Sequence, residues 1–328
     1  MAQRDSAAMQ NEHAWVLVLA AGEGRRLQEL TTTASGTVIP KQYCSLLGGP
    51  SLLQEALRRG EAIAPCERIC AVVADQHRRW WPKHTQSVPD KNVIVQPMNR
   101  GTANGILLPL LQILRRDPDA RIVVLPSDHY FDNELELAHW LRVASAPAES
   151  SEILLLGFEP RSADPQLGYI VPGQMIGSRR WAVGAFVEKP PPARASELVR
   201  AGALWNAFII AADARGLLAL YEPQCADLLR RMRDAVDGEG AGNRAGTALK
   251  ALYEELPDID FCRDLLENTQ QTLRVLAVPQ CGWSDLGTPE RVAEVLLGGT
   301  RARGARRDGA HGSSLSLAAQ HVDSRAAR

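Results

Sequence analysis

The chain has 328 residues and nearly balanced charge, with 37 lysines and arginines against 38 aspartates and glutamates. A formal charge of −1 argues against a nucleic-acid-binding protein, whose surface is normally strongly basic. No apolar run reaches transmembrane length, and the first 13 residues lack the hydrophobic core of a signal peptide. The six cysteines form no Cys-x-x-Cys pair, which indicates reduced thiols in a cytoplasmic protein rather than a zinc site or a disulfide framework.

The first half of the chain alternates short apolar runs with longer helical patterns. Strands are predicted over residues 16–20, 69–74, 92–96, 121–126 and 153–158. Helices are predicted between them, over residues 51–64, 102–116 and 134–145. Strands separated by helices of this length predict a right-handed, mostly parallel sheet with helices on both faces.

The second half has shorter candidate strands that are separated by turn residues. These strands, over residues 169–171, 181–188 and 206–211, predict antiparallel additions above a ligand cleft. The remaining predicted elements are helices over 217–236, 263–268 and 289–297 and a strand over 272–278. We expect residues 1–13 to form a flexible leader. We expect residues 299–328, rich in arginine, alanine and serine, to form a disordered tail.

The first predicted strand leads into a glycine loop that suits a phosphate ligand. After Ala21, Gly22 and Gly24 allow the main chain to approach a ligand closely, and Arg26 and Lys41 add positive charge. The loop lacks the Gly-Lys-Ser/Thr of a P-loop and the third glycine of a dinucleotide-binding fingerprint. An ordinary strand-to-helix turn is the alternative, since Gly-x-Gly after a strand is common in α/β proteins.

Two aspartates follow predicted strands. Asp128 lies in Pro-Ser-Asp-His after the strand over 121–126, and Asp285 lies in the run GWSDLG. Ligands of open α/β sheets bind beyond the carboxyl ends of the strands, and Mg²⁺ on substrate phosphates takes one or two protein carboxylates. The two aspartates could therefore meet around Mg²⁺. The alternatives are an N-cap at Asp128 and a helix start after Asp285, with Thr288 as its cap.

Three further segments suit a ligand that carries hydroxyl and phosphate groups. Glu188 and Lys189 end a strand before a proline and offer an acceptor for sugar hydroxyls beside a cation. Asn206 offers donors and acceptors among apolar neighbours. The polar residues 99–102 precede a helix, where they could read a base edge or hold an anion. The alternatives are a solvated strand end, a turn and a helix cap at Thr102.

Together and in this order, the motifs resemble those of the sugar-1-phosphate nucleotidyltransferases, most closely the mannose-1-phosphate guanylyltransferase subfamily. The matching runs cover about residues 15–290 and read LAAGEGRRL, PKQY, QPMNRGTANGI, VVLPSDHYF, GYIVPG, FVEKP, LWNAFII, DIDFCRD and GWSDLG. The resemblance implies an α/β fold with a Rossmann-like mixed, mostly parallel sheet flanked by helices. It places one domain over residues 14–298, with a nucleotide half over about 14–150 and a sugar-phosphate half over about 151–298.

The resemblance also implies nucleotidyl transfer from a nucleoside triphosphate, best GTP, to a sugar-1-phosphate, best mannose-1-phosphate, with Mg²⁺ as cofactor. Its catalytic residues would be Arg26, Lys41 and Lys189. The nucleotide would contact Ala21, Gly22, Gly24, Asn99, Arg100, Gly101, Thr102 and Ser127. The sugar phosphate would contact Gly168, Tyr169, Glu188 and Asn206, and the metal would be held by Asp128 and Asp285.

The chain departs from the usual family pattern at two places. Gln28 and Glu29 stand where an aromatic residue and a proline usually follow the Arg-Leu pair, and Ala207-Phe208 replaces Ser-Gly after Trp-Asn. Two alternatives stay open: a pairing of glucose-1-phosphate with UTP, dTTP or ATP, and a non-catalytic nucleotide-sugar sensor. We expect no nucleic-acid or membrane partner, and homo-oligomer formation stays undecided.

Overall fold

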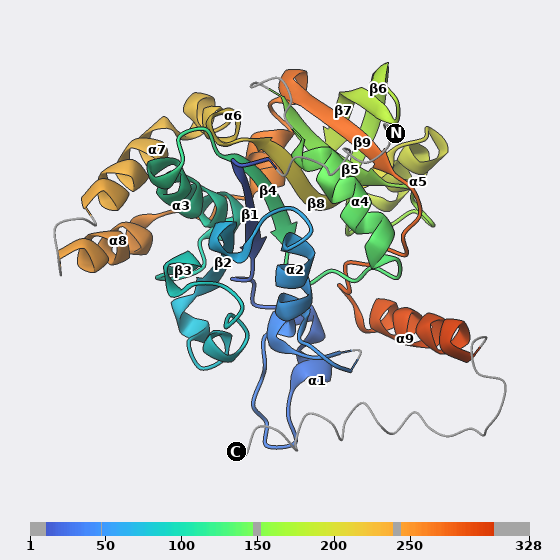
Figure 1. The fold of residues 1–328 in the computed structure, drawn as a ribbon. Helices are drawn as coiled ribbons and strands as arrows, with labels where there is room; N and C mark the ends of the chain where they lie inside the picture. The colour runs from blue at the N-terminus through green and yellow to red at the C-terminus, as the bar shows by residue number, and fades with distance from the viewer. Residues whose placement is uncertain (1–10, 47, 147–151, 239–243, 305–328) are drawn as a thin grey trace, which may run out of the picture.

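The computed structural model describes residues 11–46, 48–146, 152–238 and 244–304. Within these residues a single nine-stranded sheet has the strand order β3-β2-β1-β4-β8-β5-β9-β7-β6 (Figure 1). The strands are β1 (Ala14–Leu19), β2 (Ile69–Ala74), β3 (Val93–Gln96), β4 (Arg121–Pro126), β5 (Ile153–Phe158), β6 (Gly168–Gly177), β7 (Arg180–Val187), β8 (Leu204–Asp213) and β9 (Leu273–Val278). Their order shows that segments far apart in the sequence meet in the middle of the sheet.

Most of the helices lie on the two faces of this sheet, whereas the last helix, α9 (Pro289–Gly304), lies apart from it (Figure 1). The others are α1 (Gln28–Thr31), α2 (Leu52–Gly60), α3 (Gly101–Arg116), α4 (Glu134–Ser145), α5 (Pro192–Arg200), α6 (Ala214–Ala219), α7 (Glu222–Asp237) and α8 (Arg244–Glu255). A π-helical turn, Phe261–Leu266, packs against α3. Among the residues described, none of the helices combines the length and the apolarity that crossing a bilayer requires.

The strands of the first half pair in parallel, β1 with both β2 and β4, and β2 with β3. These strands are near-continuous apolar runs because helices cover both of their faces. Alternate side chains of β1 enter different cores: Leu17 packs with α3, α6, α7 and α8, whereas Val16 and Val18 pack with α2, α4 and α5. The sheet is therefore the middle layer of three, as the sequence predicts.

The second half adds antiparallel pairings. Strand β8 lies antiparallel between β4 and β5, β6 and β7 form an antiparallel hairpin, and β5 pairs in parallel with β9. The predicted α/β class is confirmed, with a mixed sheet flanked by helices. The antiparallel part is larger than expected, since β6 and β8 each extend over ten residues.

Several helices differ from the sequence-based expectation. The helix expected over 217–236 is divided into α6 and α7, and Cys225 has non-helical dihedral angles near the start of α7. Helices α5 and α8 were not expected, because a proline run precedes α5 and glycines precede α8. Helix α9 continues to Gly304. Residues 1–10 of the expected leader and 305–328 of the expected tail lie outside the described residues, and the domain limits stay a prediction.

Candidate active site

A cavity of about 360 Å³ opens at the carboxyl ends of β1, β3 and β4. This is the edge of an open α/β sheet at which ligands bind. Eight of the residues selected from the sequence line it, namely Ala21, Gly22, Gly24, Asn99, Gly101, Thr102, Ser127 and Asp128. Nine other residues line it without having been selected, among them Gln42, Gln96, Phe208 and Asp260.

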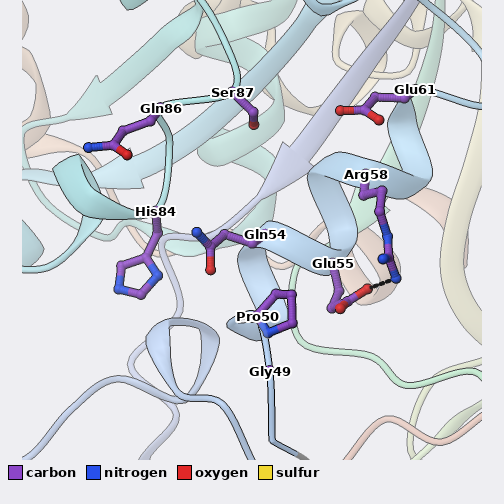
Figure 2. Close-up of a pocket in the computed structure, with 9 residues that line it drawn as sticks. All are labelled: Gly49, Pro50, Gln54, Glu55, Arg58, Glu61, His84, Gln86 and Ser87. Carbon is purple, nitrogen blue, oxygen red and sulfur yellow. Dashed lines mark hydrogen bonds and ion pairs between the residues drawn. The ribbon is translucent and has the colours of Figure 1, made fainter. Parts of the chain in front are cut away.

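A second hollow, of about 490 Å³, runs along α2 and contains none of the predicted site residues. Figure 2 shows its lining, in which Arg58 pairs with Glu55 on the helix and His84 faces Gln54 from the opposite wall. Arg58, Gln54 and Gln86 are exposed side chains on an open surface. We therefore place the candidate active site in the first cavity, where buried charges and glycine turns converge.

The two glycines of the glycine loop have different surroundings. Gly24 has φ +62°, and a Cβ there would lie 2.9 Å from the Cβ of Lys41. A Cβ on Gly22 would meet no atom within 4 Å, so this residue leaves open space beside the cavity. The Gln42 amide donates to the carbonyl oxygens of Ala20 at 2.9 Å and Gly22 at 2.8 Å, which fixes the loop. Gln42 belongs to the PKQY run but was not selected.

Lys41 connects the two predicted metal aspartates. Its side chain is 6% exposed, and Nζ lies 2.8 Å from Asp128 Oδ2. The same ammonium donates to the main-chain oxygens of Asp285 at 2.9 Å and Leu286 at 3.1 Å. Burial is the largest influence on Asp128 and would raise its pKa, but the charge of Lys41, the hydrogen bond from Lys41 and smaller contacts together outweigh it and hold that pKa below its ordinary value. Asp128 is therefore ionised at neutral pH, and the Lys41 ammonium contacts three oxygens of the protein.

The loops that carry the two aspartates are joined by main-chain hydrogen bonds. Tyr130 and Ser284 form an antiparallel bridge, with N–O distances of 2.8 and 3.0 Å. His129 is buried beside them and accepts a hydrogen bond from Trp283 Nε1 at 3.1 Å. Burial lowers the pKa of His129 to about 4, so the imidazole is neutral near pH 7 and serves the packing of these loops.

The Asp128 carboxylate is more accessible to a magnesium ion than the Asp285 carboxylate. Asp128 lines the cavity and its side chain is 38% exposed. Asp285 Oδ1 instead accepts from Arg291 at 2.5 Å and from the Gly287 main-chain N–H at 3.1 Å. Among the described residues, no three His, Cys, Asp or Glu side chains form a metal cluster. Such a donor set fits an ion that takes most of its ligands from phosphates and water.

The segment 99–102 is tied to the chain before the π-helical turn. Helix α3 begins at Gly101 without a side-chain cap, so the alternative that made Thr102 its N-cap is wrong. Thr102 Oγ1 instead accepts from the Phe261 main-chain N–H at 2.8 Å. Arg100 points away from the cavity and donates to the main-chain oxygens of Tyr253 at 2.8 Å and Glu254 at 3.0 Å. Its guanidinium is therefore bound within the protein, and its predicted contact with the nucleotide stays a prediction.

Gln96 is one of the cavity residues that the sequence analysis missed. It is 1% exposed and lines the cavity at the end of β3. Its Oε1 has no hydrogen-bond partner among the described residues. An unpaired buried acceptor at a cavity wall can accept from a ligand N–H. The only signal in the sequence was its position in the QPMNRG run.

Three residues predicted for the sugar phosphate lie together. A Cβ on Gly168 would lie 2.5 Å from Glu188 Oε2 and 3.4 Å from the Cβ of Asn206, so glycine makes room for both. Lys189 has φ +44°, and its Nζ lies 2.8 Å from Glu188 Oε1. Burial outweighs the favourable contact with Lys189 and raises the pKa of Glu188 above its ordinary value. This cluster adjoins the cavity through β8, which continues from Asn206 to Phe208.

Two other predicted residues have positions that the sequence did not indicate. Tyr169 is fully buried, and its hydroxyl donates to the Asp164 main-chain oxygen at 3.0 Å. The phenol therefore supports the loop before β6, and the predicted contact of Tyr169 with the sugar phosphate stays a prediction. Arg26 is exposed and donates to Gln166 Oε1 at 2.6 Å, so it bridges the glycine loop to the same segment.

Phe208 occupies a position where its backbone conformation favours glycine. It has φ +55°, its N–H donates to Asn206 Oδ1 at 3.0 Å, and its ring packs edge-on against Phe261. Both Phe208→Ala and Phe208→Gly lose the ring, but only the glycine variant relieves the left-handed strain of about 1–2 kcal/mol. We expect the glycine variant to have the larger free energy of unfolding in urea, by about 1 kcal/mol. An alanine variant of equal or greater stability would contradict this account.

Comparisons with known proteins identify the family of the chain. The Nucleotidyl transferase family model matches residues 15–298. A mannose-1-phosphate guanylyltransferase of Escherichia coli is 27% identical, with the match covering 85% of this chain and 59% of the relative. The xanthan biosynthesis protein XanB of Xanthomonas campestris is 28% identical over 85% of this chain and 58% of its own length. The chain thus spans less than two thirds of the length of these relatives.

A solved structure gives the same result at the level of the fold. A mannose-1-phosphate geranyltransferase from Thermus thermophilus matches with a TM-score of 0.72 and 27% identity, covering 84% of this chain and 76% of that one. A more distant structure, an inositol-1-phosphate CTP transferase from T. maritima, is 13% identical with a TM-score of 0.52 and supports the fold alone. Because the family model covers most of the chain, the protein belongs to the nucleotidyl transferase family.

Proposed function

We propose that the protein transfers a guanylyl group from GTP to mannose-1-phosphate, forming GDP-mannose and pyrophosphate. The observation that carries this proposal is the adjacency of two sets of groups. One set joins the glycine loop to Lys41 and Asp128, and the other joins Gly168, Glu188 and Asn206 beside Lys189. The first suits a triphosphate and the second suits a sugar phosphate. The names of the relatives favour this pair of substrates.

The chemistry requires no general base. The phosphate oxygen of a sugar-1-phosphate is already anionic near neutral pH, so no proton has to be removed before it attacks. The barrier lies in bringing two anions together and in stabilising the leaving pyrophosphate. In the proposed mechanism Arg26 and Lys41 neutralise the triphosphate, and Lys189 aligns the attacking phosphate. Neutral His129 takes no part in proton transfer.

We include Mg²⁺ in the proposal as the cofactor. Asp128 would hold it at the cavity wall, and Asp285 would join once its contact with Arg291 is released. When bound, the ion would supply positive charge to the phosphates. For the base, Gln96 offers a buried free acceptor to a ring N–H such as that of guanine, and Asn99 lies on the same wall. We also propose a cytoplasmic location, supported by six free cysteines.

The direct test of this reaction is identification of the products. Purified protein with Mg²⁺, GTP and mannose-1-phosphate is expected to yield GDP-mannose and pyrophosphate in equal amounts, measured by chromatography and a coupled pyrophosphate assay. Omission of the sugar phosphate is expected to stop pyrophosphate release. Tight nucleotide binding without pyrophosphate release would support the alternative of a nucleotide-sugar sensor.

Lys189→Ala separates the two halves of the site. We expect it to raise the KM for the sugar phosphate by about tenfold to a hundredfold, because it removes a charge-assisted hydrogen bond to phosphate worth about 1.5–3 kcal/mol. The KM for the nucleotide is expected to stay unchanged. Lys250→Ala, at an exposed position on α8, is the matched control. An altered KM for the nucleotide alone would show that the assignment of the two halves is wrong.

A further inference from the structure

Arg291, in the first turn of α9, joins two carboxylates from distant parts of the chain. One of its terminal nitrogens lies 2.5 Å from Asp285 Oδ1, and the other pairs with Asp164. The side chains are 15% exposed at Arg291, 12% at Asp285 and 20% at Asp164. Since all three groups are largely removed from water, their contacts are stronger than those of surface ion pairs.

Asp164 is linked through Gln166 to Arg26 after the glycine loop. Its Oδ1 accepts from the Gln166 main-chain N–H at 2.8 Å, and the Gln166 side chain accepts from Arg26 at 2.6 Å. Tyr169, at the start of β6, holds the main chain of Asp164 from the other side, as described above. Arg291 therefore stabilises both the second predicted metal aspartate and the segment that contacts Arg26.

The Asp285 carboxylate has little room for a second cation while Arg291 is bound. Its Oδ1 already accepts from the guanidinium and from the main-chain N–H of Gly287. Its Oδ2 lies so close to Gly287 that a Cβ there would approach it within 2.3 Å. A divalent ion on the same carboxylate would lie within a few ångströms of the guanidinium, where like charges repel strongly.

We propose that Arg291 competes with a divalent cation for the Asp285 carboxylate. The proposal rests on the proposed function, which places such an ion beside Asp128 and Asp285. Binding of the ion at Asp285 displaces the guanidinium, and this weakens the hold of Arg291 on Asp164. Arg291 is thus a positioning residue: it keeps Asp285 neutralised and the segment at Asp164 ordered until the cation arrives.

The competition can be measured without any turnover. Mn²⁺ alone is titrated into the protein, and the free ion is followed by electron paramagnetic resonance. Arg291→Gln keeps a hydrogen-bond donor but removes the charge, and we expect it to bind Mn²⁺ at least about threefold more tightly than the wild type. Arg291→Lys keeps the charge and is expected to remain near the wild type. Arg194→Ala, which removes an exposed arginine on α5, is the matched control.

A second change identifies the carboxylate. Adding Asp285→Asn to Arg291→Gln is expected to abolish the gain in Mn²⁺ affinity, whereas the gain would persist if it arose elsewhere. Thermal unfolding of each variant verifies that it is folded, and Arg291→Ala replaces Arg291→Gln if the latter unfolds. Unchanged or weaker Mn²⁺ binding in the charge-free variant would overturn the proposal. A gain in affinity in a protein that releases no pyrophosphate would leave the competition intact and reject only the proposed function.

Discussion

Lys41→Met is expected to reduce the rate of nucleotidyl transfer by about a hundredfold. In the described structure the Lys41 ammonium contacts three oxygens, one on Asp128 and two on the main chain at Asp285 and Leu286. Methionine fills a similar volume, but it neutralises neither Asp128 nor a substrate phosphate. We expect the loss mainly in kcat, because the charge is required where the triphosphate reacts, with a smaller change in the KM for GTP.

The control for Lys41→Met is Lys250→Met, which removes an exposed lysine from α8. Urea unfolding of both variants separates loss of catalysis from loss of fold. The Lys41 variant is expected to lose about 1–3 kcal/mol, since Asp128 keeps a partly buried charge without its partner. Activity of the folded variant within about threefold of the wild type would show that Lys41 has only a structural role.

Gly101→Ala is expected to lower the free energy of unfolding by about 3 kcal/mol or more. Gly101 has φ +82°, which strains any residue with a Cβ, and the new Cβ would lie 2.3 Å from the Ile259 carbonyl oxygen. That carbonyl is main chain and accepts from the Ala103 N–H at 3.0 Å, so it cannot move aside without cost. The displaced segment also carries Asp260, which lines the cavity, so activity should fall as well.

Gly202→Ala is the matched control for Gly101→Ala. Gly202 has a similar φ of +77°, but a Cβ there would meet no atom within 4 Å. Only the backbone strain remains, and we expect a loss of about 1 kcal/mol. The difference between the two variants isolates the contact with Ile259. Equal losses in urea unfolding would contradict the account of a closely packed segment at Gly101.

The sequence predicted the parallel half of the fold well because strands that are buried on both faces are continuous apolar runs in the sequence. Strand β2 is buried along its whole length, so its apolar run and its strand coincide. The antiparallel half was harder to predict. Strand β6 is buried only at its beginning, and its exposed end carries no continuous apolar run. The proline before α5 indicated a loop, although proline is equally suited to begin a helix.

For the site, the sequence predicted which segments meet but not where every side chain points. The predicted groups lie at or near strand ends, and the topology of the sheet determines at which edge each strand end lies. This holds for the glycine loop, for Asp128 and for the Glu188–Asn206 cluster. Tyr169 and Arg291 depend on tertiary contacts that no local pattern encodes. Arg291 pairs with Asp164, which lies 127 residues away in the chain. Periodicity and spacing carry no information on such a pair.

A substrate matrix tests the proposed guanylyltransferase activity and its substrate pair together. Purified protein with Mg²⁺ is assayed for pyrophosphate release with GTP, UTP, dTTP and ATP, each against mannose-1-phosphate and glucose-1-phosphate, and kcat/KM is determined for each pair. We expect the highest value for GTP with mannose-1-phosphate, and loss of that activity in Lys41→Met. A higher kcat/KM for UTP, dTTP or ATP with glucose-1-phosphate, or no pyrophosphate from any pair, would contradict this expectation.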